Sequence, residues 1–370
     1  MKKLGFGLMR LPLGPSGEPK DIDLDKTRDM VDAYMAAGFN YFDTAYVYHR
    51  GESEKVFGKL VADRYPRESY ILTTKMPVWL CKTEEDYESI FQKQLDRTHA
   101  GYFDYYFLHA LGNQSMPDID RLDGFGFLKK KKEAGLIRHI GFSFHGDAHT
   151  LEKILSAHPE TELVQLQINY ADWDSPTVEA RKCYELCRKA GVLVSVMEPV
   201  KGGSLARLPQ KALDLMHSVN ADASAVSWAL RYAGSLEGTL IVLSGMTTMD
   251  MLTENMKIFD NFRPLDEKER DVITETVKIF DECTPIKCTG CNYCTESCPQ
   301  NIAIPQYFNL FNTKEIYGYV PSMSNMYDSL SEEHGKASSC IACGQCEALC
   351  PQHLNIIEHL KTVGEFFEKD

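Results

Sequence analysis

Short apolar runs alternate with amphipathic segments along about the first 260 residues of the chain. Runs of this kind predict buried strands, whereas apolar residues at three- and four-residue spacing predict helices. Eight strands are expected, at residues 3–9, 39–43, 70–75, 105–109, 137–143, 163–169, 192–198 and 239–244. Helices are expected at 24–37, 52–61, 84–97, a segment ending before Gly135, 148–157, 176–190, within 209–233 and at 249–259.

This alternation predicts an α/β fold of a particular kind. Eight strands, each followed by a helix, in about 260 residues are typical of a (β/α)8 TIM barrel. A doubly wound sheet is the alternative, but no glycine-rich phosphate loop follows the first strand. Turn residues support the helix pattern: Ser175 and Pro176 are expected to begin the helix of residues 176–190, and Gly191 to end it.

The length of the chain predicts a second domain. At 370 residues it exceeds what one core usually supports. Residues 1–262 are expected to form the barrel, and a charged amphipathic segment within 263–283 is expected to be a linking helix. Residues 284–370 are expected to form a small, mostly helical domain, with helical pieces near 306–310 and 326–333.

Composition narrows the class of protein. The chain is 44% hydrophobic and 25% charged, which is typical of a globular protein. Its net charge is −13, so the chain lacks the positive surface potential that nucleic-acid binding needs. With no run of about 18 apolar residues and no signal-length apolar segment at the N-terminus, we expect a cytoplasmic protein without membrane contact. The 12 cysteines in such a compartment then favour metal or redox chemistry over disulfides.

Three consecutive strands are expected to end in ionisable residues. The second ends in Asp43, the third in Lys75 and the fourth in His109, and Tyr48 follows the second strand in a loop. Because the carboxyl ends of barrel strands converge on one mouth, these side chains are expected to meet. Each alone could be a cap, a rim charge or a packing residue, but their joint placement favours an active site.

Residues 1 to about 260 resemble the aldo-keto reductase family. The resemblance rests on residues 43–48 (DTAYVY), 74–75 (TK), 107–109 (FLH) and 137–143 (IRHIGFS). The four catalytic positions of the family correspond to Asp43, Tyr48, Lys75 and His109. The spacing of the first segment places the catalytic tyrosine at Tyr48 rather than Tyr46.

Carbonyl reduction explains why these residue types occur together. Hydride transfer to a carbonyl carbon leaves negative charge on the oxygen, which needs a proton donor and stabilising neighbours. Tyr48 is expected to donate the proton. Lys75, held by Asp43, is expected to lower the pKa of the phenol from about 10. His109 is expected to orient the substrate oxygen by a hydrogen bond.

The same resemblance implies that NAD(P)H lies across the barrel mouth. The corresponding positions are Ser143 and Gln165 for the carboxamide, and Gly202, Gly203, Ser204, Leu205, Ser244, Gly245, Glu254 and Asn255 toward the pyrophosphate and adenosine. The family often has asparagine after its serine, whereas here Phe144 and then His145 follow, and His145 is a candidate to replace part of that contact. Residues 244–252 contain no Arg or Lys to bind a 2′-phosphate, which favours NADH; a basic residue from elsewhere in the chain is the alternative.

Two cysteine runs near the C-terminus repeat one spacing, C-x2-C-x2-C-x3-C-P. The first consists of Cys288, Cys291, Cys294, Cys298 and Pro299, and the second of Cys340, Cys343, Cys346, Cys350 and Pro351. This is the bacterial ferredoxin spacing, in which three thiolates hold one [4Fe-4S] cluster and the fourth holds the other. Zinc sites are the alternative, but they take their ligands in two pairs.

The spacing therefore predicts two [4Fe-4S] clusters with crossed ligands. One is assigned Cys288, Cys291, Cys294 and Cys350, and the other Cys340, Cys343, Cys346 and Cys298. The 41 residues between Cys298 and Cys340 exceed the needs of a compact two-hairpin ferredoxin. The tail resembles the α-helical ferredoxin modules appended to some oxidoreductases, and this resemblance implies an iron-sulfur-containing branch of the aldo-keto reductases.

Three functions fit these features. The first is an NAD(P)H-dependent oxidoreductase that reduces a small aldehyde or ketone, or oxidises the alcohol, and also carries clusters. The second is a ferredoxin-linked oxidoreductase in which the clusters exchange electrons with a barrel-bound redox group and with a ferredoxin, flavoprotein or other redox partner. The third is a non-catalytic redox sensor or electron carrier. The four catalytic residues argue against the third, and the lack of a flavin signature argues against the second.

Overall fold

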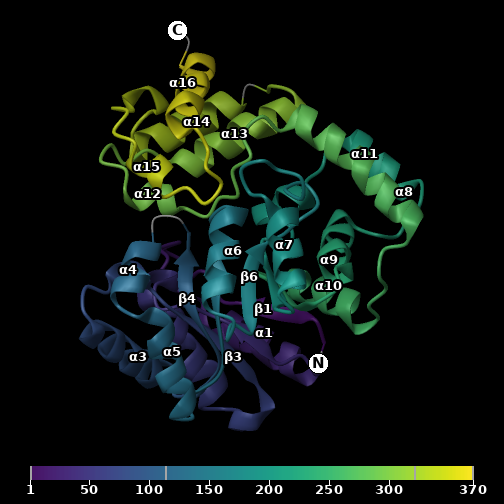
Figure 1. The fold of residues 1–370 in the computed structure, drawn as a ribbon. Helices are drawn as coiled ribbons and strands as arrows, with labels where there is room; N and C mark the ends of the chain where they lie inside the picture. Colours follow the sequence, from purple (N-terminus) through teal and green to yellow (C-terminus); the bar gives the residue numbers. More distant parts are fainter. Residues whose placement is uncertain (1, 113–114, 321, 369–370) are drawn as a thin grey trace. The chain divides into compact units, whose positions relative to one another are not determined.

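The computed structural model describes residues 2–112, 115–320 and 322–368 (Figure 1). The chain divides into two compact units. The barrel unit comprises residues 1–174, 179–199 and 230–264, and the cysteine-rich unit comprises residues 175–178, 200–229 and 265–370. The domain boundaries at residues 262 and 283 stay a prediction.

Eight parallel strands close into a barrel in sequence order, as the sequence predicts. They are β1 (Leu4–Gly7), β2 (Tyr41–Asp43), β3 (Ile71–Met76), β4 (Phe103–Leu111), β5 (Ile137–Phe144), β6 (Leu163–Gln167), β7 (Leu193–Met197) and β8 (Thr239–Ser244). β1 pairs with β2 on one side and with β8 on the other, so the sheet has no free edge.

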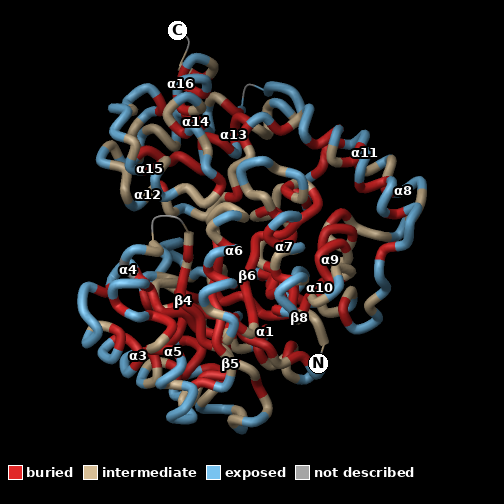
Figure 2. The backbone as a smooth tube through the Cα atoms, in the orientation of Figure 1, coloured by how far each residue is buried: buried red, intermediate tan, exposed pale blue. Residues whose placement is uncertain are grey.

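Apolar residues at paired positions hold neighbouring strands together. Phe6 pairs with Phe42, and Phe42 pairs with Leu72, across the first three strands. All three are fully buried, and the two phenylalanine rings stack with their centres 6.1 Å apart. Figure 2 shows the strands of this unit largely in the colour of buried residues. Burial of this size is the main source of barrel stability.

Helices follow the strands around the outside of the barrel (Figure 1). They are α1 (Leu24–Ala36), α2 (Ser53–Phe57), α3 (Glu84–Thr98), α4 (Met116–Arg121), α5 (Gly124–Glu133), α6 (Ala148–Ala157), α7 (Ala180–Lys189) and α10 (Met249–Asp260). α9 (Ala225–Ser235) has residues in both units.

Two helix predictions were wrong in detail. The helix expected from Pro176 begins at Ala180, because Ser175 Oγ instead accepts hydrogen bonds from the amides of Thr177 and Val178 in a local turn. The helix expected over 52–61 widens to a π-helical turn after Phe57. The helical region expected within 209–233 is present and consists of two helices.

The cysteine-rich unit is mostly helical, as predicted. Its helices are α8 (Gln210–His217), α11 (Glu267–Cys283), α12 (Tyr293–Glu296), α13 (Ile304–Tyr317), α14 (Ser322–Glu333), α15 (Gln345–Ala348) and α16 (Ile356–Phe367). Tyr307, Phe308, Tyr327 and Val363 form the centre of its core, and each is at most 1% exposed. The short helical pieces expected at 306–310 and 326–333 belong to the longer α13 and α14.

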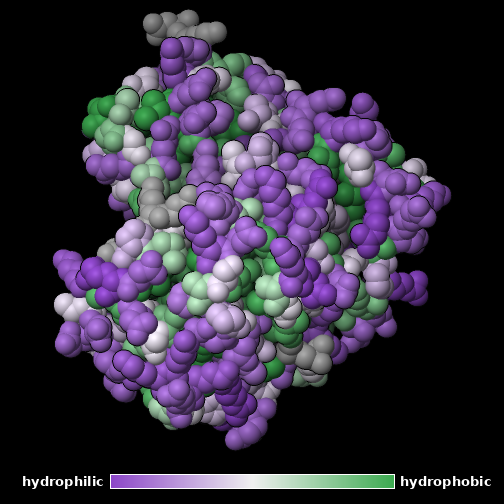
Figure 3. Space-filling model, viewed as in Figure 1, coloured by the Kyte–Doolittle hydropathy of each residue, from purple (hydrophilic) through white to green (hydrophobic). Residues whose placement is uncertain are grey.

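The surface is dominated by hydrophilic side chains on the visible face (Figure 3). Throughout residues 2–112, 115–320 and 322–368, no helix is both long and apolar enough to cross a membrane.

Candidate active site and cysteine cavities

The barrel brings the expected catalytic residues to one rim. Asp43 is the last residue of β2, Lys75 lies near the end of β3, and His109 lies near the end of β4. The strands are parallel and adjacent, so their carboxyl ends lie side by side. Asp43, Lys75 and His109 are buried, and Tyr48 is partly exposed in the turn after β2.

Lys75 connects the other charged and polar groups of this site. Its Nζ donates to Asp43 Oδ1 at 2.7 Å and to the main-chain oxygen of Thr44 at 2.8 Å. The third contact of the ammonium is the Tyr48 hydroxyl, at 3.4 Å. The sequence predicted Asp43, Lys75 and Tyr48 as one group, and the structure brings them together in that order.

Burial controls the protonation of this group. Burial is the largest cause that lowers the pKa of Lys75 and raises that of Asp43, and the attraction between the two opposes both shifts. Burial also raises the pKa of Tyr48 well above 10, helped by the nearby carboxylates of Asp43 and Glu198. In the protein alone the pKa of Tyr48 is therefore raised rather than lowered, with burial as the largest cause, and the effect of Lys75 on it stays a prediction.

His109 completes the set as a neutral imidazole. Burial is the largest cause that lowers its pKa well below 6.5, and the neighbouring Lys75 and His145 add to this shift. A neutral ring carries one N–H that can be donated to a substrate oxygen. Its Nδ1 has no hydrogen-bond partner among the described residues. The ring centre lies 5.7 Å from that of Tyr48 and 5.1 Å from that of the half-exposed Trp79.

A buried polar layer behind Lys75 was not expected from the sequence. Gln94 Nε2 donates to Glu54 Oε1 at 2.6 Å and to the main-chain oxygen of Lys75 at 3.1 Å. Thr74 and Arg97 donate to the same Glu54 carboxylate, at 2.7 and 3.3 Å. This network fixes the β3 backbone at Lys75, and the Glu54 charge favours the protonated ammonium. No local motif marks it, because Glu54 and Gln94 are 40 positions apart.

The substitution Lys75→Met is expected to destabilise the protein by about 3–5 kcal/mol at neutral pH, because it leaves the Asp43 carboxylate buried without its counter-charge. In this variant the folded-state pKa of Asp43 stays above its unfolded value, so the loss should shrink as the pH falls and Asp43 takes up a proton. Anaerobic urea unfolding followed by circular dichroism measures the effect.

The double variant Lys75→Met/Asp43→Asn is the matched control for this stability measurement. It removes the stranded charge and should recover part of the lost stability. Equal unfolding midpoints for the wild type and Lys75→Met would contradict the buried pair.

Six of the residues that are expected to bind the nicotinamide nucleotide lie in the barrel unit. Ser143 Oγ accepts from the Ala110 amide at 2.7 Å, and Gln165 Oε1 is buried with no hydrogen-bond partner in the described part of the chain. A buried acceptor of this kind fits the amide N–H of a nicotinamide carboxamide. Asn255 Nδ2 donates to Ser244 Oγ at 3.0 Å, and this hydrogen bond connects α10 to β8. The remaining two positions are Gly245, directly after β8, and the exposed Glu254 on α10.

The other four residues that are expected to bind the nucleotide belong to the cysteine-rich unit. They are Gly202, Gly203, Ser204 and Leu205, in the turn of residues 201–206. The two glycines have positive φ angles of 63° and 101°, a conformation that favours glycine. Leu205 is fully buried and therefore serves packing.

A basic residue reaches the neighbourhood of Gly245 from another part of the barrel unit. A Cβ built on Gly245 would lie 3.0 Å from the Cβ of Arg10. The sequence of residues 244–252 alone could not reveal this neighbour, because Arg10 follows the first strand. Arg10 is therefore a candidate for the basic residue from elsewhere in the chain that the alternative to NADH requires.

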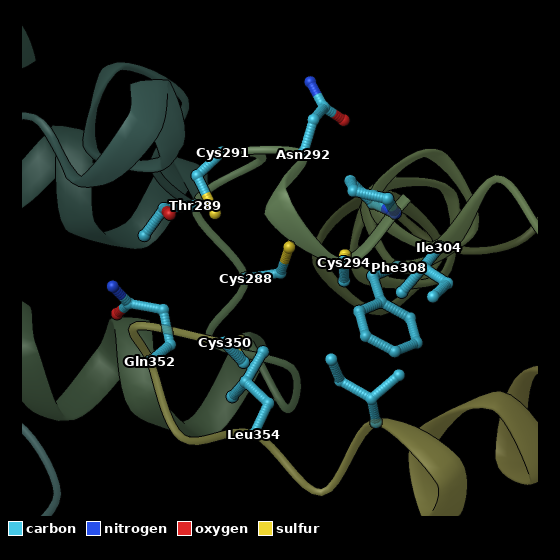
Figure 4. A pocket seen from close by; sticks show the side chains of 12 residues that line it. Cys288, Thr289, Cys291, Asn292, Cys294, Ile304, Phe308, Cys350, Gln352 and Leu354 are labelled. Carbon is cyan, nitrogen blue, oxygen red and sulfur yellow. The ribbon is translucent and has the colours of Figure 1, made fainter. Parts of the chain in front are cut away.

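The first cysteine cavity contains the ligand set that the crossed assignment predicts. Cys288, Cys291, Cys294 and Cys350 all line it, together with apolar residues from α13 and α16. Figure 4 shows the sulfur atoms of Cys288, Cys291 and Cys294 turned toward the space between them, with Cys350 across from them.

The second cavity repeats the arrangement with the other four cysteines. It is lined by Cys298, Cys340, Cys343 and Cys346. Among the described residues no three Cys, His, Asp or Glu side chains are close enough together to hold a single metal ion, and each cysteine set instead surrounds a space. Four thiolates around an apolar cavity fit the donor set of a [4Fe-4S] cluster.

Sequence families match both units. The model of the aldo/keto reductase family matches residues 3–278, and that of a 4Fe-4S dicluster domain matches residues 287–355. The chain is similar to the aldo-keto reductase str7 of Strobilurus tenacellus, with 26% identity over 55% of this chain and 60% of that protein. It is also similar to the 9,11-endoperoxide prostaglandin H2 reductase of Trypanosoma cruzi, with 22% identity over 73% of this chain and 89% of that one.

A solved structure shows the same fold. An aldo-keto reductase from Klebsiella pneumoniae, in complex with NADPH, superposes with a TM-score of 0.58 at 18% identity, over 74% of this chain and 90% of that one. This likeness concerns the barrel fold alone. The family match, in contrast, spans most of the chain, including all eight strands and the four residues at the rim. The chain therefore belongs to the aldo/keto reductase family and carries a 4Fe-4S dicluster domain after its barrel.

Proposed function

We propose that the barrel reduces a small aldehyde or ketone, or oxidises the corresponding alcohol, by hydride transfer with NAD(P)H. The observation that carries the proposal is the chain of contacts from Asp43 through Lys75 to the Tyr48 hydroxyl, with neutral His109 beside the Tyr48 ring. This arrangement offers a proton donor and a hydrogen-bond donor at one point of the rim.

Each residue has a defined part in this reaction. His109 donates its N–H to the carbonyl oxygen and so orients the carbonyl group. A reduced nicotinamide, when bound, supplies the hydride to the carbonyl carbon. Tyr48 gives its hydroxyl proton to the oxygen as negative charge develops there, and Lys75 stabilises the resulting phenolate. Asp43 and the Thr44 carbonyl hold the ammonium in place.

The nucleotide preference between NADH and NADPH is part of the proposal. The segment 244–252 still favours NADH, because it offers no cation for a 2′-phosphate and contains Asp250. Arg10 beside Gly245 favours NADPH instead. We give more weight to Arg10, since a guanidinium is well suited to phosphate.

The cysteine sets are proposed to hold two [4Fe-4S] clusters, one in each cavity. Their thiolates supply the ligands, and Ile304, which lines both cavities, lies between the two sites. Clusters of this type transfer single electrons. A chain with this many thiolates suits a reducing compartment, and we propose the cytoplasm.

An anaerobic isotope experiment tests hydride transfer. The full chain is mixed with NADPH or NADH deuterated at the reactive C4 position and a panel of aldehydes and ketones. The expected product is an alcohol that carries deuterium on the former carbonyl carbon, as measured by mass spectrometry. Nucleotide oxidation that reduces the clusters, with no deuterium in any product, would instead support the ferredoxin-linked alternative.

A further inference from the structure

The two halves of the cysteine-rich tail are structural repeats of each other. A shift of 52 positions superimposes the cysteine runs in sequence, and it also relates α12 to α15 and the start of α13 to that of α16. Hydrogen bonds repeat with it: the Asn301 amide donates to the Cys298 oxygen at 3.0 Å, and the His353 amide donates to the Cys350 oxygen at the same distance. Asn301 and His353 share positive φ angles of 52° and 50°.

The repeats differ at the residue after their first cysteine. In the first repeat this is Thr289, which is 3% exposed, and in the second it is Ile341, which is 60% exposed. Thr289 is covered by the turn of residues 201–206 within the same unit: a Cβ on Gly202 would lie 1.9 Å from the Thr289 carbonyl oxygen. One repeat therefore buries a polar residue under the chain's own turn, while its counterpart leaves an apolar residue open.

Two further positions show the same asymmetry. Leu349 is 51% exposed, whereas its counterpart Ser297 is polar and only partly exposed. Cys343 is exposed, whereas its counterpart Cys291 is partly buried. Figure 3 shows hydrophobic side chains at the surface of this unit near α14 and α15. We define the exposed residues Ile341, Cys343 and Leu349 as the outer rim; Ile341 and Cys343 line the second cavity, whereas Leu349 lines neither cavity and directly precedes Cys350 of the first.

Charge indicates which partner suits the outer rim. Residues 284–370 contain ten Asp or Glu and five Lys, with no Arg, so their net charge is −5. An apolar centre in an acidic setting complements a small protein whose own apolar patch is ringed by Lys or Arg. A second copy of this acidic unit would be repelled rather than attracted.

We propose that the outer rim is the docking surface for a small one-electron carrier protein with a basic face. The carrier exchanges one electron with the cluster held by Cys298, Cys340, Cys343 and Cys346: the cluster passes between its 2+ and 1+ states while the carrier gains or loses the same electron. No bond forms or breaks, and no proton moves. The inference rests on the proposed clusters and is independent of hydride transfer at Tyr48.

The repeat relation also assigns different roles to the two clusters. The first cavity has its equivalent position, Thr289, covered by the turn of residues 201–206, which leaves less of that cavity's lining open to a partner. The second cavity has that position open. We infer that electrons enter or leave at the second cavity; Ile304 lines both cavities and so lies between the second and the first.

The first repeat supplies the test substitutions. The double variant Ile341→Thr/Leu349→Ser places the residues of the first repeat in the second. The full chain, reduced anaerobically with dithionite that is then removed, is mixed in a stopped-flow instrument with ferric cytochrome c, a small basic one-electron acceptor. The second-order rate constant is expected to fall about tenfold in the double variant, and the wild-type rate constant is expected to fall as salt rises.

Three controls keep the result interpretable. Met326→Ser removes another exposed apolar side chain of the same unit, at 57% exposure, and should leave the rate constant unchanged. Iron content and oxidation by a small uncharged quinone, which needs no docking surface, should match the wild type in every variant. Leu349→Ser alone spares the cavity lining and should still slow cytochrome c if the double variant loses its cluster.

Two outcomes would overturn the proposal. One is an unchanged rate constant with cytochrome c in Leu349→Ser and in the double variant. The other is a wild-type chain that sediments as a dimer which Ile341→Thr/Leu349→Ser dissociates, because the rim would then be covered by a second copy. Neither outcome touches the isotope experiment, so failure of the docking surface and failure of hydride transfer are distinguishable.

Discussion

The variant Tyr48→Phe is expected to lose carbonyl reduction by about 10²- to 10⁴-fold in kcat, the range typical of a positioned proton donor. The substitution removes only the hydroxyl that lies 3.4 Å from Lys75 Nζ. The aromatic ring remains, so its packing against His109 is kept. Nucleotide affinity, measured by quenching of protein fluorescence, should therefore stay close to that of the wild type.

Tyr46→Phe is the matched control for this experiment. It removes a tyrosine hydroxyl two positions away in the same segment and keeps the ring that lies under the Arg97 guanidinium, 4.2 Å away. Its kcat should remain within about twofold of the wild type. A Tyr48→Phe enzyme as active as Tyr46→Phe would place the proton donor elsewhere.

The pH dependence follows from the same site. The pKa of Tyr48 is raised well above 10, so the phenol keeps its proton at neutral pH, and reduction should show no alkaline decline from Tyr48 below pH 10. The pKa of His109 lies well below 6.5, so its ring stays neutral and should cause no acid limb near pH 6.5. An acid limb near that pH which disappears in His109→Ala would contradict the neutral imidazole.

The strands were predictable because their signal is local. Runs such as residues 70–75 are apolar, short and followed by turn residues, and the structure places all eight strands where these runs occur. The rim residues followed from topology, because parallel barrel strands end at one mouth. Helix boundaries were less accurate where a side chain formed a local turn instead of a cap, as Ser175 does.

The interactions that tune the site were not predictable, because they join distant parts of the chain. The contact between Gln94 and Glu54 spans 40 positions, and neither residue belongs to a motif. The rise in the Tyr48 pKa depends on burial and on Glu198, which no sequence pattern reports. Likewise, Arg10 beside Gly245 could be found only in three dimensions.

The spacing predicts the crossed cysteine assignment, and its proof requires chemistry. The variant Cys291→Ala/Cys350→Ala is expected to keep one intact [4Fe-4S] cluster and about four irons per chain. Both substitutions fall on the first cavity, so that set retains only Cys288 and Cys294, while the second cavity keeps all four thiolates. Iron analysis and the EPR signal of the reduced protein measure the remaining cluster.

The variant Cys291→Ala/Cys298→Ala is the matched comparison. It also removes two thiolates, but both come from the same cysteine run and not from the same cavity. It takes one ligand from each cavity, so neither retains four thiolates, and no intact [4Fe-4S] signal should survive. At most, three-thiolate [3Fe-4S] clusters would remain. If each run held its own cluster, the two results would exchange, because Cys291 and Cys298 would then belong to the same site. The pair of variants therefore decides between crossed and uncrossed ligation even if single substitutions leave altered clusters behind.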